Sequence, residues 1–149
     1  MKVLLLHGPN LNLIGGREPR IYGTATLAEI DAAAVARGLE LGVEVNSFQS
    51  NSEGAIIDAI QMAGRQGVDG IVINPAGYSH TSVAIRDALL GVGLPAFEVH
   101  LSNPAAREDF RRLDFIAGAC LGVVAGFGGR GYLLALEQLA THLREETPG

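Results

Sequence analysis

The sequence predicts an α/β fold in which one parallel sheet of five strands is covered by helices on both faces. Short apolar runs of strand length alternate with longer stretches of helical periodicity along the whole chain. The connections between them are short, and short crossovers between parallel strands are right-handed. The length of 149 residues suits a single domain, residues 1–149. We therefore expect a three-layer sandwich with strand order 2-1-3-4-5.

The first half of the chain contains two predicted pairs of strand and helix. Residues 3–6 are an apolar run that stops at a Gly-Pro-Asn turn, and they predict a central strand. Residues 43–48 alternate between apolar and polar side chains, as a half-buried strand does. Helices are predicted to follow from Thr26 and from Ser50, because a glutamate three residues after each completes a capping box. The first helix should end at Gly42.

The second half of the chain continues the same alternation. Residues 71–73 are β-branched and predict a strand buried on both faces, followed by a helix that Thr81 or Ser82 caps. The remaining predicted elements are a strand at 94–100, a short helix from Pro104, a strand at 119–125 and a helix with a leucine stripe at 133–143. The helix from Pro104 would offer backbone N–H groups to an anion beside His100.

Composition argues against several classes of function. The net charge of −5 disfavours nucleic acid as a partner. No apolar stretch is long enough for a membrane span or a signal peptide, so we expect a cytoplasmic protein. The single cysteine, Cys120, should be a small buried side chain in the last strand. The single lysine, Lys2, stands at the start of the first strand, which argues against an imine-forming enzyme.

Polar side chains follow the predicted strands at the edge where the carboxyl ends meet. Asn10 follows the first strand, Asn74 and His80 follow the third, and His100 ends the fourth. In an open parallel sheet, ligands bind at this edge, at the point where the strand order reverses. With the order 2-1-3-4-5, Asn10 and Asn74 flank that point. Ordinary strand-to-helix turns with a structural histidine are the alternative interpretation of these segments.

Residues 15–24 have the composition of a lid over such a site. Glycine stands near both ends of the segment, with proline and charged residues between. The segment carries Arg17 and Tyr22, where a domain without a function would have a shorter turn. The alternative is that Tyr22 only packs and Arg17 is a surface charge.

Other kinds of site fit the sequence less well. No two of the four histidines have the i, i+4 spacing of a helical metal pair, and no acidic cluster accompanies them. The chain has no Gly-x-Ser-x-Gly nucleophile motif. The glycine-rich segment 126–131 lacks the Gly-Lys-Ser/Thr ending of a phosphate loop. A flavin phosphate would need small hydroxyl residues after the first strand, where Pro9, Asn10 and Asn12 stand.

The remaining candidates form a site for proton transfer. They are a phenol, two imidazoles, two amides and several arginines, namely Tyr22, His80, His100, Asn10, Asn74, Arg107, Arg111 and Arg112. Together they supply an acid, a base and an anion clamp. A small polyhydroxylated carboxylate that undergoes proton transfer would use all of them, with no cofactor.

Six groups of residues also match a known family. They are Gly8-Pro9-Asn10-Leu11-Asn12, Arg17-Glu18-Pro19 with Tyr22-Gly23, Gln49-Ser50-Asn51 with Glu53-Gly54, Asn74-Pro75 with His80-Thr81-Ser82, Glu98-Val99-His100 with Ser102-Asn103, and Arg107-Glu108 with Phe110-Arg111. Through them the chain resembles type II 3-dehydroquinate dehydratase over residues 3–139. The resemblance implies a flavodoxin-like fold, a homododecamer built from trimers, and loss of water from 3-dehydroquinate to give 3-dehydroshikimate. It also implies that no metal, cofactor or imine is used. The reaction would serve either aromatic amino-acid biosynthesis in the shikimate pathway or quinate breakdown.

The resemblance assigns a catalytic role to five residues. Tyr22 would be the base that takes the C2 proton, with Arg17 beside it in the lid. Asn10 would hold a water on the enolate oxygen. His100, oriented by Glu98, would protonate the departing C1 hydroxyl.

The resemblance also assigns the contacts that bind the substrate. Asn74, His80 and Arg111 would hold the ring hydroxyls, and the backbone N–H groups of Leu101 and Ser102 would bind the carboxylate. Asp87 would reach the site of a neighbouring subunit.

The chain departs from the family pattern at a few positions. His7 stands where asparagine is frequent, Ser52 where histidine is frequent, and residues 113–114 are Leu-Asp where His-Ser is frequent. The added charge of Asp114 is expected to draw Arg111 away from the substrate.

Two other classes of protein remain as alternatives. One is a non-catalytic flavodoxin-like regulatory or binding domain, although a phosphoacceptor receiver would need acidic residues at the end of the first strand, and residues 7–12 contain none. The other is a flavin electron carrier, which a colourless purified protein would rule out.

Overall fold

The computed structural model describes residues 1–16 and 18–147, without the side chains of Pro19 and Tyr22. Within this part of the chain, five parallel strands form one sheet in the order β2-β1-β3-β4-β5, which confirms the predicted topology. The strands are β1 (Lys2–His7), β2 (Glu44–Gln49), β3 (Gly70–Asn74), β4 (Ala96–His100) and β5 (Gly122–Ala125). The α-helices are α1 (Pro19–Tyr22), α2 (Leu27–Leu41), α3 (Glu53–Arg65), α4 (Val83–Val92) and α5 (Arg130–Glu146).

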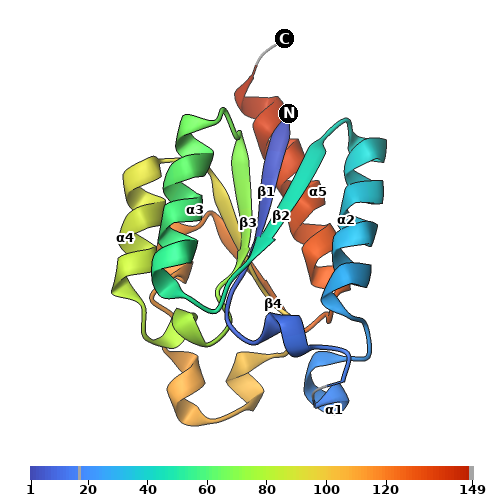
Figure 1. Ribbon diagram of the computed structural model, residues 1–149, viewed down its shortest axis with the longest axis vertical. Helices are drawn as coiled ribbons and strands as arrows, with labels where there is room; N and C mark the ends of the chain where they lie inside the picture. Colours follow the sequence, from blue (N-terminus) through green and yellow to red (C-terminus); the bar gives the residue numbers. More distant parts are fainter. Residues whose placement is uncertain (17, 148–149) are drawn as a thin grey trace.

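The helices form two layers on the two faces of the sheet (Figure 1). Helices α2 and α5 pack on one face, and α3 and α4 pack on the other. Each face has its own cluster of buried apolar side chains, one centred on Leu136 and Leu139 of α5 and the other on Ile56 and Ile60 of α3. All five residues of β3 are buried, as expected for a strand covered on both faces. None of the helices in the described ranges is both long and apolar enough to cross a membrane.

The helix starts follow the predicted caps with one correction. The Thr26 side chain accepts a hydrogen bond from the Glu29 backbone N–H, and Gly42 ends α2 in the left-handed conformation. Ser82 caps α4. The predicted cap at Ser50 is wrong, because Ser52 accepts from the backbone of residue 55. The Ser50 hydroxyl instead accepts from the Ser52 backbone N–H at 3.0 Å, so it shapes the turn before the helix.

The prediction of one helix from Pro104 is also wrong. The segment forms two short 3-10 helices, η3 (Pro104–Ala106) and η4 (Asp109–Arg112). Asn103 caps η3 by accepting from the Ala105 backbone N–H, but the backbone at Arg107 is extended and stops the turn. Glu108 is extended too. The connection is therefore helical only in short pieces, and it carries no helix long enough for a large dipole.

The last strand begins later than predicted. Strand β5 starts at Gly122, because the preceding residues form the 3-10 helix η5 (Ala117–Ala119). Cys120 follows η5 and lies outside the strand, where it is partly buried. Burial raises the pKa of the Cys120 thiol to about 12, so it stays protonated and is not a nucleophile at neutral pH.

The strand ends and several connecting segments gather at one edge of the sheet (Figure 1). Because all strands are parallel, their carboxyl ends meet there, together with η1 (Leu11–Leu13) and η2 (Ala76–His80). Helix α1 and the η3–η4 segment lie at this same end of the molecule. The predicted lid thus contains one helical turn, and Arg17 lies outside the described residues.

Candidate active site

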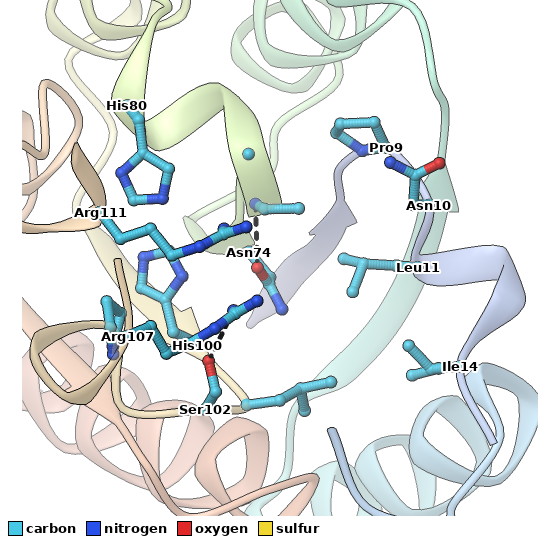
Figure 2. A pocket seen from close by; sticks show the side chains of 14 residues that line it. Pro9, Asn10, Leu11, Ile14, Asn74, His80, His100, Ser102, Arg107 and Arg111 are labelled. Carbon is cyan, nitrogen blue, oxygen red and sulfur yellow. Dashed lines mark hydrogen bonds between the residues drawn. The ribbon is translucent and has the colours of Figure 1, made fainter. Parts of the chain in front are cut away.

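A pocket lies at this edge between the loops that follow β1, β3 and β4 (Figure 2). Its walls include most of the predicted ligand-binding residues, namely Asn10, Asn74, His80, His100, Leu101, Ser102 and Arg111. Figure 2 shows Asn10 on one side, His80, Arg111 and His100 on the other, and Asn74 between them. The fold therefore brings residues from three strand ends to one cavity.

The loop after β1 holds Asn10 through contacts with β2 and β3. Asn10 has φ 69°, a left-handed conformation that asparagine tolerates. Its backbone N–H donates to the Asn51 side chain at 3.0 Å, and Gln49 donates to Asn51 and to the Gly8 carbonyl. A Cβ at Gly8 would lie 2.5 Å from the Pro75 carbonyl oxygen, so only glycine fits there. The Gln49-Ser50-Asn51 motif therefore supports the loop that carries Asn10.

Asn74 ends β3 with its side chain fixed at both polar atoms. The side chain is 2% exposed. Its carbonyl oxygen accepts from the Ala76 backbone N–H at 3.0 Å, and its amide nitrogen donates to the Tyr132 hydroxyl at 2.9 Å. The amide thus has one orientation toward the pocket.

His100 forms a buried pair with Glu98 on β4. The histidine Nε2 lies 2.6 Å from Glu98 Oε1, and Glu98 is fully buried. Burial, together with the nearby Asp114 carboxyl, raises the pKa of Glu98 to about 9. Burial lowers the pKa of His100, against the opposing effect of Asp114. At neutral pH the pair therefore holds one exchangeable proton inside the protein, which is what a general acid needs.

Replacing Glu98 by glutamine should stabilise the protein relative to the wild type, and the difference should grow as the pH rises. Above pH 4.5 the unfolded chain has released this proton, while the folded protein keeps it up to about pH 9, so wild-type stability falls across that window. Glutamine has the same shape and does not ionise. We expect the difference in the free energy of unfolding, Glu98→Gln minus wild type, to increase by at least about 1 kcal/mol from pH 5 to pH 8. Urea unfolding of both proteins at pH 5 and at pH 8 measures this difference. A difference in stability that does not change with pH would contradict the shifted pKa.

Asp114 has a structural role and does not draw Arg111 away. One oxygen of Asp114 accepts from the backbone N–H groups of Ile116 and Ala117, at 2.9 and 3.0 Å. Its other oxygen lies 3.9 Å from His100 Nε2. Arg111 instead donates to Glu108 at 2.6 Å, which lowers the pKa of that carboxyl. The expected pairing of Asp114 with Arg111 is therefore wrong.

Basic groups line the wall beside His100. His80 Nδ1 lies 2.7 Å from the Leu113 carbonyl oxygen and must donate to it, which leaves Nε2 for another partner. Arg107 donates to the Ser102 hydroxyl at 3.2 Å and lines the same cavity as Arg111. Arg107 was a candidate for the anion clamp from its place in the basic segment, but the resemblance assigned it no contact with the substrate. The predicted contacts also left out the apolar lining from Pro9, Leu11 and Ile14.

Among the described residues, two predicted site residues, Glu98 and Asp87, do not line the pocket; Glu98 lies behind His100. Asp87 is exposed on α4 and lies with residues of α3 at a different surface hollow. Tyr22 is the last residue of α1, and its side chain is outside the description, as is Arg17. Two neighbours of Tyr22, Arg20 and Ile21, share a surface hollow with Ser102 and Arg107, so α1 lies at the rim of the site.

One set of side chains in the described ranges has the donor types of a metal site. Glu98, His100 and Asp114 have ligand atoms within 4.8 Å of one another, so the expectation that no acidic cluster accompanies the histidines is wrong for His100. Two ligands of a tetrahedral ion with bonds of about 2.1 Å would lie about 3.4 Å apart. The Glu98–His100 separation of 2.6 Å is shorter and matches a hydrogen bond. The arrangement thus favours proton transfer.

The chain is similar to one protein family, to named relatives within it and to a solved structure. The family model described as Dehydroquinase class II matches residues 1–140. The chain is 54% identical over 143 residues to "Catabolic 3-dehydroquinase 1" of Aspergillus terreus, covering 96% of this chain and 93% of that protein. It is 55% identical over 139 residues to "3-dehydroquinate dehydratase 1" of Ralstonia nicotianae, covering 93% and 89%. The crystal structure of a type II dehydroquinase from Butyrivibrio crossotus superposes with a TM-score of 0.91 at 45% identity, covering 93% and 97%.

Proposed function

The chain belongs to the class II dehydroquinase family, and we propose that it removes water from 3-dehydroquinate to give 3-dehydroshikimate. The observation that carries the proposal is the buried Glu98 paired with His100, which lines a pocket with amides and arginines. The reaction needs one proton removed and one delivered, and the pair holds one to deliver. The same elimination would serve biosynthesis or quinate breakdown.

Substrate binding is proposed to place the carboxylate at the loop after β4. The backbone N–H groups of Leu101 and Ser102 would donate to it, and both residues line the pocket. Arg107 adds positive charge at the same place, since it donates to the Ser102 hydroxyl. Asn74 and His80 then face the ring hydroxyls from the loop after β3, with Arg111 beside them. These contacts fix the ring against the two groups that exchange protons with it.

The first chemical step is proposed to be removal of the C2 proton by the Tyr22 phenolate. The electron pair of the broken C–H bond moves into the C3 carbonyl and forms an enolate. Asn10, on the side of the pocket across from His100, would hold a water that donates to the enolate oxygen. Arg17 would stabilise the phenolate from the same lid segment.

The second step expels the C1 hydroxyl. The enolate collapses to the ketone, the C1–O bond breaks, and a C1–C2 double bond forms. His100 gives its proton to the departing oxygen, which leaves as water, and Glu98 supplies the pair's proton to the imidazole. No step requires a metal, a cofactor or an imine.

The function is tested by mixing the purified protein with 3-dehydroquinate. We expect the ultraviolet absorbance of the conjugated enone to rise at a rate proportional to enzyme concentration. Borohydride added with the substrate should not inactivate the enzyme, and dialysis against a chelator should leave the rate unchanged. A folded protein that produces no enone would overturn the proposal, and inactivation by borohydride would overturn the imine-free mechanism alone.

We also propose that the chain works in the cytoplasm as a homododecamer, arranged as a tetramer of trimers. Several large apolar side chains are exposed and would be covered by neighbours, namely Phe110, Leu113, Leu121, Val123 and Phe127. Asp87 lies away from the pocket of its own chain, so it could act only at a neighbour's site. Sedimentation at micromolar concentration should give roughly twelve times 15.6 kDa. A monomer would contradict the assembly and the role of Asp87.

A further inference from the structure

A line of buried hydrogen bonds runs from the pocket to the surface of α2. The Tyr132 hydroxyl, which accepts from the Asn74 amide, lies 2.9 Å from His7 Nδ1. His7 Nε2 lies 2.7 Å from the Asp31 carboxylate. His7 and Tyr132 are fully buried, and the Asp31 side chain is 27% exposed. These groups come from β1, α5, β3 and α2, and the reaction scheme above uses only Asn74.

The direction of every hydrogen bond in this line is fixed by its two ends. At the pocket end, the Ala76 backbone N–H can only donate, so it selects the oxygen of the Asn74 side chain. The Asn74 nitrogen must then donate to Tyr132. At the surface end, the Asp31 carboxylate can only accept, so His7 must carry its proton on Nε2. The buried Tyr132 O–H needs an acceptor, and His7 Nδ1 is the one that the described contacts give it, so Nδ1 carries no proton and the O–H points to it.

We propose that Asp31, His7 and Tyr132 are positioning residues that hold the Asn74 amide in its substrate-binding orientation. The Ala76 bond alone leaves the amide able to pivot, whereas the Tyr132 bond fixes its second polar atom. His7 and Asp31 keep the Tyr132 hydroxyl turned away from Asn74, so that its oxygen always accepts from the amide. One N–H of Asn74 is left for a ring hydroxyl. The effect on turnover rests on the proposed function, but the hydrogen-bond direction does not.

Nuclear magnetic resonance of histidine labelled with nitrogen-15 tests that direction without substrate. We expect His7 at neutral pH to be the neutral tautomer with the proton on Nε2, and the Tyr132→Phe variant to shift the Nδ1 resonance. A proton on Nδ1, in either the other tautomer or the charged form, would overturn the assigned direction.

Turnover of two single variants and their double variant tests the positioning role. Tyr132→Phe keeps the buried ring and removes the hydroxyl, and we expect kcat/KM to fall about tenfold, the usual effect of losing one buried hydrogen bond. In an Asn74→Ala background the same change should have almost no further effect, because its target is gone. An equal loss in both backgrounds, or no loss in either, would overturn the proposal.

Two further variants separate positioning from folding. Thr141→Val removes a hydroxyl from the same helix, where Thr141 bonds only to the Glu137 carbonyl in the described contacts, and it should leave kcat/KM unchanged. Asp31→Ala should lower kcat/KM several-fold, and Asp31→Asn should restore most of it, because the amide oxygen still accepts from His7. Unfolding midpoints of all variants identify any loss due to misfolding. If Asp31→Asn were as impaired as Asp31→Ala, the acceptor role of Asp31 would be wrong.

Discussion

Replacing His100 by alanine is expected to lower kcat by about a thousandfold, with a change in KM of less than about tenfold. A general acid acts on charge that develops only in the transition state, so its loss affects turnover far more than binding. Solvent water can donate a proton in its place, but without the fixed geometry that Glu98 gives the imidazole at 2.6 Å. Initial rates from enone absorbance, over a range of substrate concentrations, separate kcat from KM.

A matched control for this variant is His142→Ala. His142 lies on α5, away from the pocket that holds His100, so its loss should leave both kinetic constants near those of the wild type. If His100→Ala raised KM strongly and left kcat intact, His100 would be a binding contact and the acid would be another group.

Replacing Tyr22 by phenylalanine is expected to abolish measurable turnover, because phenylalanine has no group that can take the C2 proton. We expect a fall in kcat of at least about a thousandfold, within the range for loss of a general base. Substrate should still bind, since Tyr22 is not assigned a contact with the carboxylate or the hydroxyls. Stopped turnover with retained binding, measured by calorimetry, supports this role. Full activity would mean that Tyr22 is not the base.

The companion variant Arg17→Gln tests how a phenol becomes a base. A free phenol has a pKa of about 10, so ionisation near pH 7 requires roughly 4 kcal/mol in favour of the phenolate. One guanidinium about 4 Å away supplies on the order of 4 kcal/mol at an effective dielectric of 20, before desolvation opposes it. Without Arg17 the phenol ionises only at higher pH, so the acidic limb of kcat against pH should move upward. A limb that stays in place would assign the activation to another group.

The succession of strands and helices and the place of the site were predictable because both depend on local patterns. Alternating apolar runs define the strands, and in a parallel sheet the residues after each strand meet at one edge. Asn10, Asn74 and His100 could therefore be assigned to one pocket before their distances were known. The N-cap of α3 at Ser52 was not predictable, since Ser50 and Ser52 are both good capping residues and lie only two positions apart.

Contacts between distant segments were the part that the sequence did not reveal. Asp114 lies beside Glu98 and His100, and Tyr132 lies between His7 and Asn74, although each is separated from its partners by irregular connections or by whole elements. The short pieces η3 and η4 have no periodicity to reveal which way Arg107 and Arg111 point. Buried polar networks of this kind depend on precise side-chain positions, which propensity and periodicity do not determine.

The contact at Gly8 has a consequence for redesign of the enzyme. The loops after β1 and β3 meet where the Gly8 N–H donates to the Asn74 carbonyl oxygen at 2.8 Å and no side chain fits between them. Main-chain contact therefore sets the spacing of the walls that carry Asn10 and Asn74. Libraries that vary only the lining side chains would change the polarity of the cavity while its width at this point stayed constant. Acceptance of a bulkier ring would require a longer loop after β1.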